Sequence, residues 1–251
     1  MNTILLTLLF QILWIACTYG QVHVALQINS SVSVHFIVTD PHGYRTGADP
    51  RGKHKDAAYG VTFIREISGA NYAFTGLGPP ESDSHEFVFN FDLPTDSGTY
   101  TIQVIGNKTA AFWLDLYVGT HEHMQDKSWS IDTAGAIQKD SVITFTLRVP
   151  PDTTSVPRLL KIVSSRTLLA DIAAMYAVHS IKDRIKLKRY ADLVRLYEQK
   201  MAMSDRADAV STLRTLVDDI KADSGHGLAR RDANLLIKDV EELLNHAPGS
   251  R

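Results

Sequence analysis

Hydrophobic and polar residues alternate along most of the first 150 positions of the chain. A period of two places alternate side chains on one face of a β-strand, and turn-forming residues separate the runs. No helical period interrupts them. The pattern predicts strands within 22–28, 32–38, 87–91, 100–104, 112–118 and 143–149. Several short strands without intervening helices are typical of an antiparallel sandwich or barrel.

From about Ser165 the period changes to that of amphipathic helices. Four apolar stripes recur at three- and four-residue spacing, within 168–176, 187–201, 210–220 and 236–244. A segment with three prolines in eight residues, 150–157, separates the two patterns and indicates a boundary. We expect an α+β multidomain fold: an antiparallel β-sandwich over 21–157, then a small four-helix bundle over 158–251. A last strand within 158–163 is the alternative at this border.

The first 20 residues carry no charged side chain and contain an apolar run of 13, from Ile4 to Ala16. A transmembrane helix needs about 20 apolar residues, whereas a signal peptide needs fewer. The sequence predicts a signal peptide over 1–20, cut before Gln21. The alternative is a lipoprotein signal, cut before Cys17 with the thiol acylated. We expect a secreted or periplasmic protein, attached to a membrane only if Cys17 carries lipid.

Composition places the chain among globular proteins, with 44% hydrophobic and 22% charged residues. The formal charge of −2 argues against a dedicated nucleic-acid binder, which needs a strong basic excess. The charge is unevenly divided, because 21–157 hold 15 acidic and 9 basic residues and 158–251 hold 13 and 17. A basic helical part is compatible with an anionic partner, or with solvated faces that merely differ in charge.

Two segments resemble modules of exported bacterial proteins. The stretch DPHGYRTGADP over 40–50, with PTDSGTYTIQVIG over 94–106, is similar to a pre-peptidase or immunoglobulin-like β-sandwich module. Residues 169–244 resemble the FIMAH domain, a small helical module, although Gly225-His226-Gly227 stands where that family usually has a Gly-Lys pair. Both resemblances imply a secreted accessory protein, and neither implies a set of catalytic residues.

Candidate ligand-binding residues lie in the loop over 40–56 and at two tryptophans. The loop presents Arg45, Asp49 and Arg51, whose charges could contact a ligand or simply shape turns. Trp113 and Trp129 could stack on sugars, although a sandwich core could bury either of them.

Two histidines two positions apart, His121 and His123, would share one face of a strand. They could bind one metal ion, and the alternative is a solvated strand end. We expect no cofactor.

The chain has no Gly-x-Ser-x-Gly, His-Glu-x-x-His, Walker or Gly-x-Gly-x-x-Gly motif. The leading hypothesis is an exported, non-catalytic binding or accessory protein of the bacterial envelope, which contacts polysaccharide or an envelope protein. The alternatives are a secreted hydrolase with an unrecognised site and an assembly protein that binds partners through its helical stripes.

Overall fold

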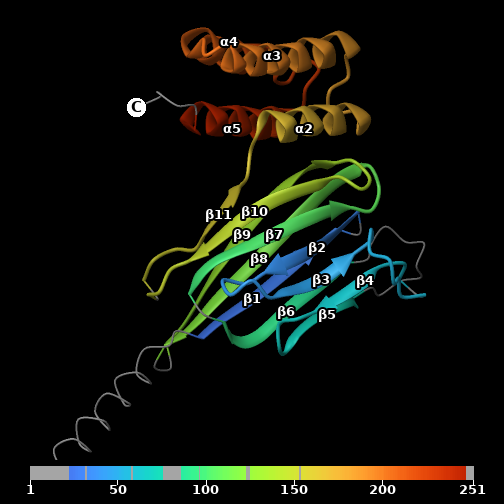
Figure 1. Ribbon diagram of the computed structural model, residues 1–251, viewed down its shortest axis with the longest axis vertical. Coiled ribbons are helices and arrows are strands. Elements are labelled where there is room, and N and C mark those ends of the chain that lie inside the picture. Colours follow the sequence, from blue (N-terminus) through green and yellow to red (C-terminus); the bar gives the residue numbers. More distant parts are fainter. Residues whose placement is uncertain are drawn as a thin grey trace, which may run out of the picture.

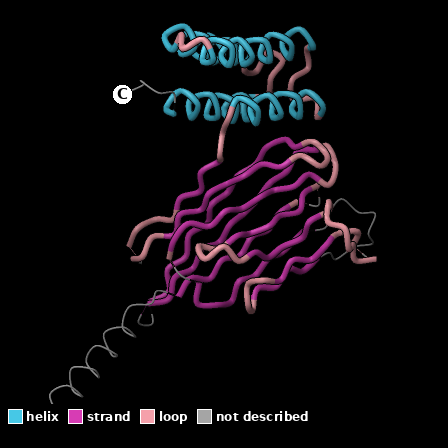
Figure 2. Tube along the Cα trace, viewed as in Figure 1, coloured by secondary structure: helices cyan, strands magenta, loops and turns pink. Residues whose placement is uncertain are grey.

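The computed structural model describes residues 23–246, apart from 32, 58, 76–85, 96, 123, 124 and 153. Two β-sheets pack face to face, and four helices lie along one edge of this sandwich in two layers (Figure 1). Strands and helices are segregated along the chain, with all described strands before the helices (Figure 2). The α+β fold class predicted from the two hydrophobic periods is confirmed.

The first sheet has five antiparallel strands in the order β5-β6-β1-β8-β9. Its central strand β1 pairs with β6 on one side and β8 on the other, so that Ile28 lies opposite both Phe89 and Leu116. Strand β9 is an edge strand that pairs along the whole length of β8. The bounds are β1 His23–Ser30, β5 Ala70–Thr75, β6 Glu86–Thr95, β8 Ala110–Glu122 and β9 Gln125–Ile137.

The second sheet has six antiparallel strands in the order β11-β10-β7-β2-β3-β4. Its bounds are β2 Val34–Thr39, β3 Arg45–Asp49, β4 Thr62–Arg65, β7 Gly98–Gly106, β10 Val142–Val149 and β11 Arg158–Lys161. The last strand, β11, pairs with β10 and places Lys161 opposite Phe145, which is the alternative of a last strand within 158–163. The prolines of 150–157 lie in the connection between these neighbouring strands.

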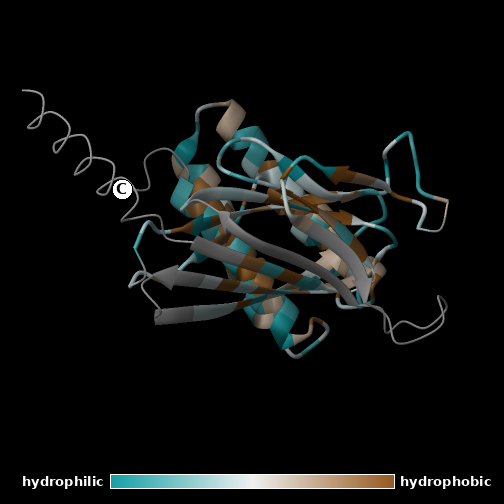
Figure 3. Ribbon diagram, turned by 90° about the horizontal axis from the view of Figure 1, so that it is seen from below, coloured by the Kyte–Doolittle hydropathy of each residue, from teal (hydrophilic) through white to brown (hydrophobic). Residues whose placement is uncertain are grey.

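Alternate side chains of the two sheets meet in one buried cluster. Its members include Leu26, Ile28, Phe36, Tyr100, Ile102, Leu114, Leu116, Val118, Phe145 and Leu147. Hydrophobic positions gather where the packed elements face one another (Figure 3). Burial of each such large side chain contributes about 1.5–3 kcal/mol to folding, so this cluster holds the sheets together.

The four predicted apolar stripes each fall on one helix: α2 Ser165–Ala177, α3 Arg184–Ala202, α4 Arg206–Asp223 and α5 Arg230–His246. Local sequence sets the helix starts, because Ser164 and Thr167 form a capping box before α2, and Asp183 caps α3. The stripes meet in a second buried cluster that includes Leu168, Ile172, Met175, Tyr190, Val194, Leu213, Leu216, Leu236 and Val240. Ala136 of β9 also packs in this cluster, which joins the bundle to the sandwich.

Candidate functional surfaces

The three loop residues predicted to contact a ligand form ion pairs within the loop region. Arg45 begins β3, and its Nη2 lies 2.9 Å from Oε1 of Glu66. Asp49 ends the same strand and accepts a hydrogen bond of 3.0 Å from Nε of Arg51. Burial alone would raise the pKa of Asp49, but the hydrogen bonds and charge of Arg51 have the larger combined effect and lower that pKa. The two pairs stand at opposite ends of β3, roughly 13 Å apart, so the fold joins Asp49 to Arg51 and leaves Arg45 separate.

The other carboxylates of this loop stabilise turns. Oδ1 of Asp40 accepts hydrogen bonds from the backbone N–H groups of His42 and Tyr44, at 2.9 and 2.8 Å. Oδ1 of Asp56 accepts one from the backbone of Tyr59 at 3.2 Å. These contacts are the Asx turns expected of aspartates in loops. Within the described residues no group of three or more His, Cys, Asp or Glu side chains could hold a metal ion.

Some predicted positions lie outside the described residues. These are Cys17 and His123, together with the side chain of His121. The backbone of His121 lies near the end of β8, opposite Asp126 of β9. The metal and lipidation hypotheses therefore stay predictions.

The two tryptophans lie on opposite faces of the five-stranded sheet. In β8, Phe112 and Leu114 point into the sandwich core, so Trp113 between them projects outward. Trp129 of β9 lies directly opposite the buried Val118 and so shares the inner face. Both indoles are partly exposed. They cannot form a single platform for stacking on a sugar.

Polar side chains lie on the outer face of the sheet beside the two outward residues of β8 that follow Trp113. Along β8, Asp115 and Tyr117 project on the same side as Trp113, and Tyr117 is 43% exposed. Strand pairing places Gln27 and Ser130 beside Tyr117, and Asn29 and Asp132 beside Asp115. We call these seven residues the sheet-face patch: Gln27, Asn29, Trp113, Asp115, Tyr117, Ser130 and Asp132. Sequence reasoning identified Trp113 but missed its neighbours, because they depend on the register of three strands.

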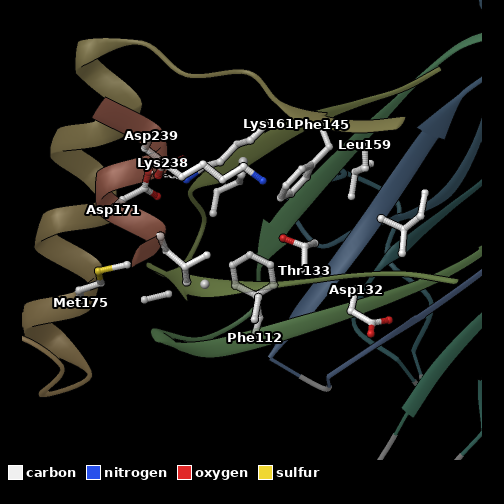
Figure 4. A pocket seen from close by; sticks show the side chains of 16 residues that line it. Phe112, Asp132, Thr133, Phe145, Leu159, Lys161, Asp171, Met175, Lys238 and Asp239 are labelled. Carbon is white, nitrogen blue, oxygen red and sulfur yellow. Dashed lines mark hydrogen bonds and ion pairs between the residues drawn. The ribbon is translucent and has the colours of Figure 1, made fainter. Parts of the chain in front are cut away.

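A buried charge cluster joins the sandwich to the helices. Lys161 lies on the inward face of β11, beside Phe145. Its Nζ lies 2.8 Å from Oδ2 of Asp171 in α2 and 2.7 Å from Oδ2 of Asp239 in α5 (Figure 4). The two aspartate side chains are only 5% and 8% exposed. We call these three residues the junction triad; the sequence analysis did not predict it.

The junction triad holds one cation against two carboxyl groups. Burial raises the pKa of Asp171 to about 6; the charge of Lys161 opposes the rise and that of Asp239 adds to it. Burial also disfavours the Lys161 ammonium, but the two carboxylates outweigh it and raise its pKa. The adjacent cavity, lined by Phe112, Phe145 and Met175 among others, measures about 120 Å³. Small-molecule sites usually occupy about 300–1,000 Å³, so the triad is better suited to joining layers than to binding a substrate.

Comparisons with known protein families, with curated proteins and with solved structures found no match. The resemblances to exported bacterial modules therefore stay predictions. Among the helices of the described residues, none is long and apolar enough to cross a membrane.

Proposed function

We propose that this protein is an exported, non-catalytic polysaccharide-binding protein and that the sheet-face patch is its ligand surface. The observation that carries the proposal is the outward row of Trp113, Asp115 and Tyr117 on β8, beside amide and carboxyl groups of β1 and β9. Export rests on the uncharged, apolar segment over 1–20.

The chemistry of the patch suits a chain of sugars. An aromatic ring offers a flat apolar face on which the C–H side of a pyranose ring can stack, and amide and carboxyl oxygens accept hydrogen bonds from hydroxyls. Trp113 and Tyr117 are four residues apart on one strand, roughly 13 Å. Two aromatic contacts at this spacing would engage separate units of an extended polymer.

The charge of the patch favours a neutral polysaccharide. Asp115 and Asp132 are directly opposite one another on β8 and β9, and none of the seven patch residues is basic. An acidic polymer such as a uronate would meet like charge there, which is unfavourable. A neutral glucan, xylan or mannan meets only hydrogen-bonding groups and aromatic rings.

Affinity electrophoresis of the full chain through gels that contain soluble β-glucan, xylan, mannan or starch tests the proposal. At least one of these polymers should retard the protein. Trp113→Ala and Tyr117→Ala should each weaken that binding about tenfold, equivalent to about 1.4 kcal/mol. Tyr44→Ala is the matched control, because Tyr44 is 57% exposed on the turn between β2 and β3.

Circular dichroism of each variant verifies that it folds. The proposal is wrong if no polymer retards the wild-type protein. It is also wrong if the two patch variants are retarded as strongly as the Tyr44→Ala control.

A further inference from the structure

A groove with an apolar floor lies between α2 and α3 and has a volume of about 730 Å³. Its floor includes Leu169, Ile172 and Ala173 of α2 and Leu187 of α3. Ile172 is only 1% exposed and belongs to the bundle core, so the groove reaches down to the core. We call it the α2–α3 groove.

The rim of the α2–α3 groove is basic. Arg184, Lys188 and Arg195 line it, and no acidic residue does. Among the described residues, the side chains of Arg184 and Lys188 make no hydrogen bond or ion pair, and Arg195 pairs only with the exposed Asp192. In contrast, other basic residues of α3 pair with acids of α4 or of the turn before it: Lys186 with Asp223, Arg189 with Asp219, and Lys200 with Asp205. Arg184 and Lys188 are thus two groove cations that the described part of the bundle leaves available.

An apolar side chain stands out beside these cations. Ile185 is 76% exposed at the second position of α3 and lines the groove together with Arg184 and Lys188. Exposure of a large aliphatic side chain next to an apolar hollow is unfavourable in water and favours a partner that covers both.

Shape and charge together identify the kind of partner. A bilayer surface is flat and would reach Ile185 but not the buried floor at Ile172, whereas a helix can place a ridge of side chains in a groove between two helices. The 13 residues of α2 span about 20 Å, a length that a helix of similar size would follow. Acidic side chains flanking its apolar face would meet the basic rim.

We infer that the α2–α3 groove binds an amphipathic helix with acidic flanks, supplied by a partner protein. The apolar face of that helix covers Ile185 and the groove floor, and its carboxylates pair with Arg184 and Lys188. This site is independent of the sheet-face patch and involves a different element of the fold.

Selection from a displayed library of random 15-residue peptides tests this inference on the full chain. Peptides enriched on the wild-type protein should carry apolar residues at i, i+3, i+4 and i+7 together with Glu or Asp on the flanks. A synthetic peptide of the enriched sequence should bind less tightly as salt is raised. The double variant Ile185→Ser, Lys188→Glu should weaken its binding at least tenfold.

Met203→Ser is the matched control, because Met203 is 66% exposed at the other end of α3 and should leave peptide binding unchanged. The inference is overturned if no peptide is enriched, if enriched peptides lack the acidic amphipathic pattern, or if they bind the double variant equally well. It is also overturned if phosphatidylglycerol vesicles, rather than any peptide, bind in a manner that requires Ile185.

Discussion

Replacement of Lys161 by Met tests whether the junction triad holds the helices to the sandwich. The substitution keeps most of the apolar stem, which packs beside Phe145, and removes only the ammonium. Asp171 and Asp239 then face each other, 5% and 8% exposed, with no cation between them. Each must lose its charge or remain ionised in a poorly solvated place, and both outcomes cost free energy.

The structure suggests the size of the effect. Lys161 makes two short charge-assisted contacts, at 2.8 and 2.7 Å, with carboxylates that are nearly inaccessible to water. Removal of one partner from a buried pair typically costs 3–5 kcal/mol, and we expect Lys161→Met to lower the free energy of unfolding by about that amount. Lys200→Met is a closely matched control, because Lys200 also bridges two aspartates, at 3.3 and 3.0 Å, but at the surface. Water solvates that cluster, so the control should change stability little.

Urea unfolding at neutral pH, followed by circular dichroism for the helices, measures both variants. Urea is preferable to guanidinium because it does not screen charges. A second substitution set, Lys161→Met with Asp171→Asn and Asp239→Leu, should recover most of the loss, because no charge remains buried. The reasoning is refuted if Lys161→Met costs no more than Lys200→Met, or if the triple variant is as unstable as the single one.

Four further outcomes are expected. Burial raises the pKa of Asp171 from 3.8 to about 6. The protonated carboxyl group therefore stabilises the folded state fully below pH 4, and this stabilisation is lost as pH rises toward 6. In Asp171→Asn the free energy of unfolding in urea should depend less on pH across that window, by about 1.4 kcal/mol per pH unit. Tyr190→Phe removes a 2.6 Å hydrogen bond to the Asp223 carboxylate and should cost about 1.5–3 kcal/mol in the same assay. Gly47→Ala would place a Cβ 2.1 Å from a carbonyl oxygen of β2 and should cost more than about 4 kcal/mol. Gly60 also has a positive φ but open space around it, so Gly60→Ala should cost only about 1 kcal/mol. Thermal unfolding of the two glycine variants measures this difference in stability.

The spacing of hydrophobic residues along the chain was enough to predict most of the architecture. Alternation in β8 and β10 and the stripes of the four helices are local signals, and each corresponds to an element in the structure. Strand β9 gave no such signal, because its apolar positions are mainly Trp129 and Ile131 among polar or small residues. As an edge strand it is partly or fully exposed at every position from Ser128 to Gly135, so few of these positions need to be apolar.

The charged junction leaves a signal in the sequence. Asp171 and Asp239 each follow a buried leucine, Leu168 or Leu236, by three residues and therefore lie on the apolar stripe of their helix. A charge in such a position indicates a buried partner. The identity of that partner was beyond sequence reasoning, because Lys161 and Asp239 are 78 positions apart. The sheet-face patch was hidden in the same way, since three strands supply it and their register is set by tertiary packing.

Helix α2 lies between the junction triad and the α2–α3 groove. One side of it presents Asp171 to the junction triad, and another presents Leu169 and Ala173 to the α2–α3 groove. Only three residues, 162–164, separate β11 from α2, and the capping box at Ser164 fixes the direction in which the helix leaves the sheet. A tether this short, reinforced by three buried charges, leaves little freedom for the bundle to move on the sandwich. A polysaccharide on the sheet-face patch and a partner helix in the groove would therefore be held in one fixed orientation relative to each other. Modules joined by a flexible linker would not impose such an orientation.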